Sequence, residues 1–258
     1  MDRPDISTAE LVALLEWYHE AGVDLAIDEA PHDHFAEADA ARRQKAQPVA
    51  RVVPSPASPE QAAQSARALA AEAPTLDALR SLMAGFEGCE LRRTARQLVF
   101  SDGIAGARVM LVGEAPGRDE DEQGLPFIGR SGKLLDRMLA AIGLDRSSVY
   151  IANVIPWRPP GNRTPTPQEI AICLPFIERH IALAAPDVLV CLGGPSAQTL
   201  LNQRDGILRL RGRWFDYDCN GRVIPALATL HPAYLLRQPA QKKLAWRDLR
   251  ALQAKLRG

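Results

Sequence analysis

The chain has 258 residues, of which 47% are apolar and 24% are charged, the usual mixture of a globular protein that is long enough to bury a core. No apolar run approaches the ~20 residues that a membrane-spanning helix needs, and the N-terminus lacks the basic and then apolar layout of a signal peptide. Membrane and secreted proteins are therefore disfavoured, and we expect a cytoplasmic protein.

The formal net charge of zero hides an uneven distribution. Residues 1–40 carry eleven acidic side chains against one arginine, a net charge of −10. Residues 230–258 carry seven basic side chains against one aspartate, a net charge of +6. A basic end is weak evidence for a polyanionic partner, and a solvated helix face is the simpler explanation unless other features point to nucleic acid.

Residues 1–30 are predicted to contain an acidic helix. Ser7 and Glu10 have the spacing of a capping box, the next apolar residues fall on one helical face, and Gly22 is a plausible stop. Such a helix can serve as a docking element, for a partner that its sequence does not identify.

Residues 31–75 are expected to form a flexible linker. They contain 14 alanines and 6 prolines in 45 residues, with few larger apolar side chains. Such a stretch buries too little surface to offset the entropy lost on ordering.

Residues 76–258 have the pattern of a folded domain. Short apolar, β-branched runs at 109–112, 149–154, 188–192 and 223–230 alternate with helical stretches near 133–142, 167–184, 195–201 and 241–256. Wholly apolar strands that alternate with helices indicate a parallel sheet covered on both faces. We therefore predict an α/β protein, a three-layer α/β/α sandwich around a short, mainly parallel four-stranded sheet, with an N-terminal helical extension.

Polar residues follow each predicted strand. Glu114 comes after the first strand, Asn153 ends the second, Ser196 follows the third and His231 follows the fourth. In open parallel sheets, ligands bind beyond the carboxyl ends of the strands. If the four strands are parallel, these side chains converge on one edge of the sheet.

Residues at this edge suit a reaction that releases an anionic leaving group. Glu114 can orient a water molecule, His231 can stabilise developing negative charge, and the amide of Asn153 matches the edge of an amide-like base. Phe127 could offer a flat face for base stacking. Taken singly, each has an ordinary structural explanation: a strand-end Asn is more often a turn former, and a Phe between Pro and Ile is more often core.

Several motifs of the chain, in order, resemble the uracil-DNA glycosylase superfamily, most closely its family 4. The resemblance covers about residues 86–250 and rests on Gly113-Glu114-Ala115-Pro116-Gly117 followed by Glu120-Asp121, Pro126-Phe127-Ile128-Gly129, Asn153-Val154, Arg158-Pro159-Pro160-Gly161-Asn162-Arg163 and His231-Pro232-Ala233-Tyr234-Leu235-Leu236-Arg237.

The resemblance implies a role for each matched position. Glu114 would position the attacking water and His231 would stabilise the departing base as catalytic residues. Phe127, Asn153 and Glu120 would bind the base, with Glu120 crowding the side of the ring where thymine carries its methyl group. Leu235 would fill the hole left by the extruded nucleotide. The remaining DNA contacts would come from Arg158, Asn162, Arg163, Gly193, Ser196 and Arg237.

The chain departs from family 4 at the cysteines. Members typically hold a 4Fe-4S cluster with four cysteines, and the corresponding residues here are Phe86, Cys89, Trp157 and Cys173. Because such a cluster ordinarily needs four thiolates, we expect that it has been lost, that Phe86 and Trp157 fill its space, and that Cys89 and Cys173 are what is left of the site. A cluster rescued by other ligands stays the competing interpretation.

The function that follows is hydrolysis of the N-glycosidic bond of uracil in DNA, without metal or cofactor, by a monomer. One alternative is a catalytically silent DNA-binding relative. The other is an interaction protein whose N-terminal helix is the active part.

Overall fold

The computed structural model describes residues 7–23, 33 and 58–257. The chain forms two compact units, Met1–Val53 and Pro54–Gly258, which are considered separately below. Among the described residues, none of the helices has the length and apolar character required to cross a bilayer.

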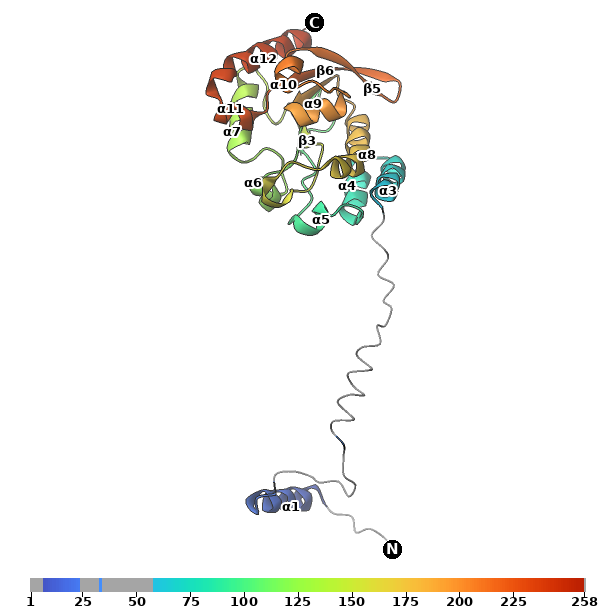
Figure 1. Ribbon diagram of the computed structural model, residues 1–258, viewed down its shortest axis with the longest axis vertical. Coiled ribbons are helices and arrows are strands. Elements are labelled where there is room, and N and C mark those ends of the chain that lie inside the picture. The colour runs from blue at the N-terminus through green and yellow to red at the C-terminus, as the bar shows by residue number, and fades with distance from the viewer. Residues whose placement is uncertain (1–6, 24–32, 34–57, 258) are drawn as a thin grey trace. The chain divides into compact units, whose positions relative to one another are not determined.

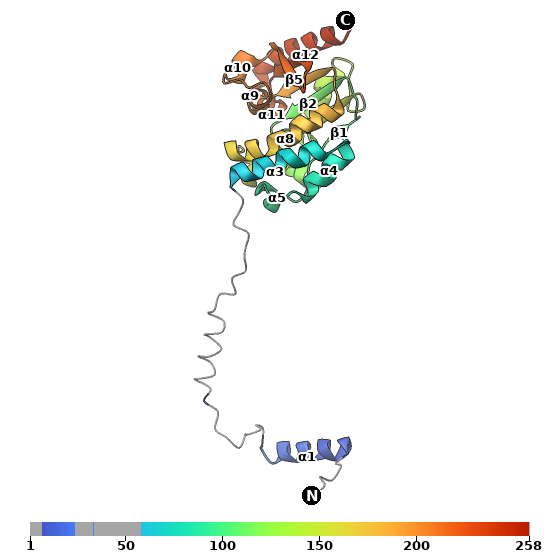
Figure 2. The same ribbon diagram turned by 90° about the vertical axis from the view of Figure 1, so that its right-hand side faces the viewer.

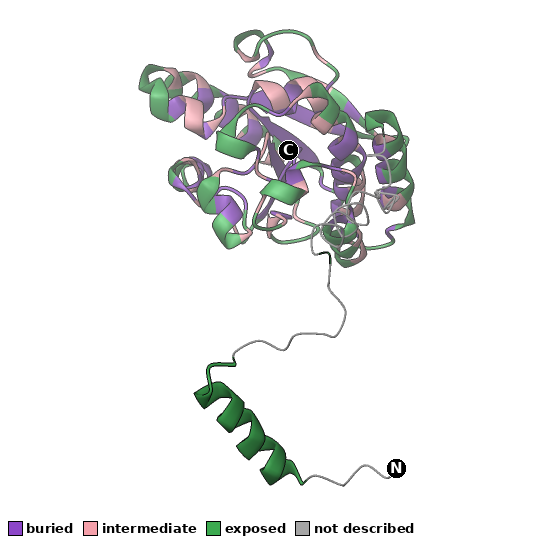
Figure 3. Cartoon of the chain, turned by 60° about the horizontal axis from the view of Figure 1, so that its bottom comes forward, coloured by how far each residue is buried: buried purple, intermediate pink, exposed green. Residues whose placement is uncertain are grey.

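The first unit contains the expected acidic helix. Helix α1 (Thr8–Glu20) begins at a Ser7 N-cap, and Ser7 and Glu10 form the reciprocal hydrogen bonds of a capping box. Its side chains are exposed throughout, as the green helix of Figure 3 shows, and they include Leu15 and Trp17.

The expected linker is wrong in its last part. Residues 59–72 form helix α3 (Pro59–Glu72), which Ser58 and Gln61 cap and whose Ala62, Ala66 and Ala70 are buried. This helix packs along α8 (Pro167–Ala184) (Figure 2). Alanines four residues apart line one face, so two helices can approach closely without large apolar side chains. Residues 31–32 and 34–57 of the expected linker lie outside the described part of the chain.

A six-stranded sheet forms the centre of the second unit. Its order is β1-β3-β2-β4-β6-β5, and the inner four strands are parallel. The strands are β1 (Asp102–Gly103), β2 (Val109–Gly113), β3 (Val149–Asn153), β4 (Val188–Leu192), β5 (Trp214–Cys219) and β6 (Arg222–Thr229).

The four predicted strands are the four parallel ones, but the predicted number of strands is wrong. Two antiparallel edge strands, β1 and β5, were missed. β1 has only two residues, and β5 is largely exposed, so neither carries the continuous apolar run that marks an inner strand.

Helices cover both faces of the sheet, as a three-layer sandwich requires (Figure 1). α7 (Arg130–Ala140), α11 (Pro232–Arg237) and α12 (Lys242–Arg257) pack on one face; α3, α4 (Leu76–Gly85), α8 and α9 (Gly194–Leu200) pack on the other. The shorter elements are α5 (Leu91–Thr94), α6 (Arg118–Gln123), α10 (Ile207–Leu210) and the 3-10 turns η1 (Pro160–Asn162) and η2 (Pro239–Gln241).

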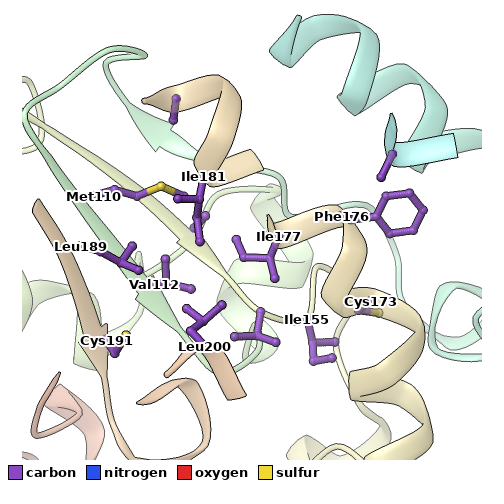
Figure 4. Packing of buried hydrophobic residues seen from close by; sticks show 14 of the residues in the cluster. Met110, Val112, Ile155, Cys173, Phe176, Ile177, Ile181, Leu189, Cys191 and Leu200 are labelled. Carbon is purple, nitrogen blue, oxygen red and sulfur yellow. The ribbon is translucent and has the colours of Figure 1, made fainter. Parts of the chain in front are cut away.

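The alternation of side chains along each inner strand divides the core into two clusters. Met110 and Leu189 face α8, where they meet Ile177 and Ile181 (Figure 4). Val109, Leu111 and their neighbours on the other strands face α7 and α12. Burial on both faces explains why these strands are apolar at every position.

Candidate active site

A cavity of about 580 Å³ lies at the carboxyl ends of the parallel strands. The cavity is lined by residues of the loops after β2, β3, β4 and β6 and by Asn153, the last residue of β3. Glu114, Glu120, Phe127, Asn153 and His231, the five residues expected to act on the base, all line this one cavity. β3 and β4 flank β2 on opposite sides, which is the kind of switch point where open α/β sheets bind ligands.

His231 presents one defined tautomer to the cavity. It is the N-cap of α11, where its Nδ1 accepts a hydrogen bond from the Ala233 N–H at 3.0 Å. Burial, assisted by the charge of Arg237, lowers the pKa of His231 to about 4. The imidazole is therefore neutral near pH 7, and since Nδ1 accepts, the proton lies on Nε2, which is left as a donor.

Asn153 brings an unused acceptor to the same cavity. Its side chain is buried, and Oδ1 is the one buried side-chain nitrogen or oxygen atom in the described part of the chain that has no hydrogen-bond partner. The neighbouring strand leaves room for it only because position 113 is glycine: a Cβ there would lie 2.4 Å from Oδ1. A ligand N–H that reached this atom would satisfy it.

Phe127 forms part of the cavity wall beside His231. The two ring centroids lie 5.3 Å apart, and Phe127 is only 4% exposed. The ring is thus buried, but it lines the cavity and is not sealed in the interior. Its backbone adopts a φ of +55°, in the left-handed region that a bulky residue rarely occupies.

Glu114 follows β2 directly. Its backbone C=O accepts a hydrogen bond from the Ile155 N–H at 2.9 Å, which ties the turn to the end of β3. Burial raises the pKa of the Glu114 carboxyl above its usual value. A carboxylate with a raised pKa at a cavity wall is suited to accept a proton.

Glu120 is engaged by the backbone. Its carboxylate accepts hydrogen bonds from the N–H groups of Gly117, Ile128 and Gly129 at 3.1, 3.1 and 3.0 Å. These bonds tie the loop after β2 to the segment that carries Phe127. Glu120 also lines the cavity.

Two of the three arginines expected to contact DNA, Arg158 and Arg163, bind other side chains in the free protein. Arg158 donates to Asn162 Oδ1 at 2.6 Å, and Arg163 makes two hydrogen bonds to the Glu169 carboxylate, at 2.8 and 2.6 Å. Asn162, Arg163, Gly193 and Arg237 line the cavity, whereas Arg158 does not.

Two of the expected DNA contacts are wrong. Ser196 is fully buried, and its hydroxyl donates to the Val112 C=O at 2.7 Å, so it cannot reach a phosphate. Leu235 is 1% exposed and packs in the core, whereas Leu236 is 37% exposed. Both errors concern short helices, where the direction of a side chain depends on packing that the motif does not encode.

The cavity also contains residues that the sequence did not single out as site residues. They include Thr164, Ile207 and Tyr234. Tyr234 stands within the His231 motif, and its position on α11 could have indicated it. Ile207 lies in α10 and follows no recognisable motif.

The residues at the cluster positions do not fit a four-cysteine cluster. Phe86 and Trp157 are buried with stacked rings whose centroids are 6.5 Å apart, and the Phe86 ring lies over Gly88, where a Cβ would meet it at 2.5 Å. The Sγ atoms of Cys89 and Cys173 are 3.9 Å apart. Within the described residues, no group of three or more His, Cys, Asp or Glu side chains could hold a metal ion.

Comparison with known proteins gives a family match and several similar relatives. The sequence profile of the uracil DNA glycosylase superfamily matches residues 100–250, which include the inner strands and the cavity loops. The chain is 42% identical over 167 residues to the type-4 uracil-DNA glycosylase of Archaeoglobus fulgidus, covering 63% of this chain and 83% of that relative.

Two further relatives carry the same description. The type-4 uracil-DNA glycosylase of Thermotoga maritima is 41% identical over 150 residues, which is 58% of this chain and 77% of the relative. That of Pyrobaculum aerophilum is 35% identical over 178 residues, which is 67% of this chain and 91% of the relative.

Proposed function

Because the chain belongs to the uracil-DNA glycosylase superfamily, we propose that its cavity hydrolyses the N-glycosidic bond of uracil in DNA, as a repair enzyme. The observation that carries the proposal is that Glu114, Asn153 and His231, distant in the sequence, line a single cavity. The target bond is inaccessible in a duplex, so the nucleotide must first be extruded, at a cost of a few kcal/mol.

Asn153 and Phe127 would recognise the base. Uracil offers an N–H between two carbonyl groups, and the unpartnered Oδ1 of Asn153 is an acceptor for it. The Phe127 ring, beside His231, would stack on the base. Glu120 would have a second role, exclusion of the thymine methyl group, because its carboxylate lies at the cavity wall.

His231 would stabilise the leaving group. As the bond between C1′ of the sugar and N1 of the base breaks, the electron pair leaves with uracil and negative charge develops on its O2 carbonyl oxygen. Nε2–H of a neutral imidazole can donate to that oxygen. A donor already fixed where charge develops lowers the barrier without reorganisation during the reaction.

Glu114 would act on the other reactant, water. The nucleophile adds to C1′ of the sugar, and the proton it loses can pass to the Glu114 carboxylate. The raised pKa of this carboxyl brings it closer to the pH at which the reaction runs.

Contacts to the DNA backbone would hold the extruded nucleotide. Asn162, Arg163, Gly193 and Arg237 line the cavity, and Arg163 and Arg158 could exchange their side-chain partners for phosphates. We assign the filling of the vacated space to Leu236 instead of Leu235, because only Leu236 is exposed.

We further propose that the protein carries no iron-sulfur cluster, since aromatic side chains occupy two of the four ligand positions. None of the residues assigned to uracil chemistry is at a cluster position. The cytoplasmic location and the monomeric state stay predictions.

The proposed function is tested by incubating the full chain with matched oligonucleotides that contain uracil, thymine or cytosine at one position. We expect free uracil, and a strand that alkali cleaves at the abasic site, from the uracil substrate alone. DNA binding without release of uracil would instead identify a silent relative.

A further inference from the structure

The backbone at Phe127 needs support that its own sequence does not provide. A φ of +55° is unfavourable for a bulky side chain and persists only where the surroundings hold it. This conformation nevertheless directs the ring toward His231, so what holds it also determines where a base would stack.

The N–H groups after Phe127 are held from one side. Glu120 Oε1 accepts hydrogen bonds from Ile128 and Gly129 at 3.1 and 3.0 Å. Gly132, in the first turn of α7, leaves room for the backbone of Phe127. A Cβ at position 132 would lie 1.5 Å from the Phe127 carbonyl oxygen.

The carbonyl groups are held from the other side by a residue of a different loop. Arg146, between α7 and β3, donates from Nη1 to the Pro126 carbonyl oxygen at 3.2 Å and from Nη2 to that of Phe127. The same guanidinium is fixed by two carboxylates: Nε donates to Asp136 at 2.7 Å, and Nη1 also donates to Asp102.

We propose that Arg146 is a positioning residue for Phe127: its guanidinium holds the left-handed turn at 126–127 and thereby the ring on which uracil stacks. The inference rests on the proposed function. Arg146 does not line the cavity, so any effect it has on uracil excision must pass through the segment that it holds. Lysine could not replace it, because one ammonium group cannot bind two carbonyls and two carboxylates in this planar arrangement.

A double-mutant cycle between Arg146→Met and Phe127→Ala tests this inference. We expect Phe127→Ala to lower kcat/KM for uracil release by about 10- to 100-fold, the range of one base–aromatic stack. Arg146→Met should lower kcat/KM about tenfold when Phe127 is present and less than about twofold when Phe127 is already alanine. The reason is that both changes act through the same contact, the stacking of Phe127 on the base. Arg146→Lys should fall between wild type and Arg146→Met and show the same dependence on Phe127.

Arg179→Met is the matched control. Arg179 also joins two segments through a backbone carbonyl, that of Ala73 at 3.0 Å, but it lies on α8 away from the cavity. We expect it to lower Tm without changing kcat/KM. If Arg146→Met does not fold, Arg146→Lys replaces it in the cycle.

Two results would overturn the inference. One is that Arg146→Met lowers kcat/KM by the same factor with and without the Phe127 ring. The other is that Arg146→Met leaves kcat/KM unchanged when the ring is present. An inactive wild type would overturn the proposed function and this inference with it, whereas an active wild type with additive losses would overturn the inference alone.

Discussion

Asn153 carries a polar atom that the folded chain leaves without a partner, and Ser196 carries one that is fully paired. Both side chains are buried. An unpaired buried acceptor lowers the free energy of unfolding of the ligand-free protein. A ligand that donates a hydrogen bond to this acceptor removes the penalty. The two residues should therefore respond to truncation in opposite ways.

We expect Asn153→Ala to change the free energy of unfolding by less than about 1 kcal/mol, or to raise it, because no protein hydrogen bond to Oδ1 is lost. Uracil release should fall by about 100-fold or more, since the base loses its acceptor. Ser196→Ala should cost about 1–3 kcal/mol because the Val112 carbonyl loses its donor, with little change in rate. Urea unfolding and single-turnover kinetics measure both; a large loss of stability in Asn153→Ala would contradict this account.

Sequence reasoning located the residues at strand ends better than those on short helices. Glu114, Asn153 and His231 come together because parallel strands present their carboxyl ends at one edge, which topology alone predicts. Ser196 and Leu235 lie on α9 and α11, where one step along the chain turns a side chain by about 100° from surface to core. A motif match does not resolve that rotation.

At the scale of the element, the two neighbouring leucines of α11, Leu235 and Leu236, have different environments. Leu235 packs under α11 in the core, and Leu236 points outward at 37% exposure. The same substitution at the two positions should therefore have different consequences.

Leu235→Ala should lower the free energy of unfolding by about 2–4 kcal/mol, as expected when a buried leucine is truncated. Leu236→Ala should leave stability within about 1 kcal/mol and slow uracil release from duplex DNA about tenfold, with less effect on single strands, where no vacated space needs filling. Urea unfolding and parallel rates on duplex and single-stranded substrates distinguish the two. If Leu236→Ala releases uracil from duplex DNA at the wild-type rate, Leu236 does not fill the space left by the extruded nucleotide.

Helix α3 forms where the composition predicted a linker. Few large apolar residues suggested a linker, yet Ala62, Ala66 and Ala70 form a buried stripe against α8. The signals of a helix start were present in Ser58, Pro59 and Gln61, a capping box with proline in the first turn. Small side chains can form a core where two backbones approach closely, and residue counts do not measure that.

At the scale of the whole molecule, two histidines with lowered pKa values, the buried His180 and the half-buried His231, link folding to pH. Burial lowers the pKa of His180 to about 3 and is the main cause that lowers the pKa of His231 to about 4. His180 is a buried residue of α8, where its Nε2 is 2.7 Å from the Tyr150 hydroxyl and its ring stacks on Phe100.

Both histidines bind a proton more readily in the unfolded chain, where their pKa is near 6.5. The unfolded state therefore gains protons first as the pH falls below about 6.5, and the folded state loses stability until its own histidines titrate. Their contribution to stability is full above this window and declines through it.

His180→Gln should weaken this dependence on pH. Between about pH 6.5 and pH 5, the free energy of unfolding should fall by about 2 kcal/mol less in this variant than in wild type, because the His180 imidazole is absent. Urea unfolding across this range gives the slope for wild type, for His180→Gln and for His19→Gln, an exposed control on α1. If the free energy of unfolding of His180→Gln depends on pH as steeply as that of wild type, the lowered pKa of His180 is not the cause of the dependence.

The arrangement of layers was predictable because strands buried on both faces are apolar at every position, as in β2 and β4. The edge strands were not, since β5 is mostly exposed and β1 has two residues. The cavity follows from the inner strands and their loops, whereas the contacts that hold its loops, such as Arg146 on the Phe127 turn, join segments that no local pattern connects.

The rate of uracil release in a single turnover, compared between wild type, His231→Ala and His19→Ala, tests the central claim most directly. Losing a fixed donor to the departing base should slow release by about 10²- to 10³-fold in His231→Ala, while His19→Ala matches wild type. Uracil release by His231→Ala at the wild-type rate, or none by wild type, would contradict the account.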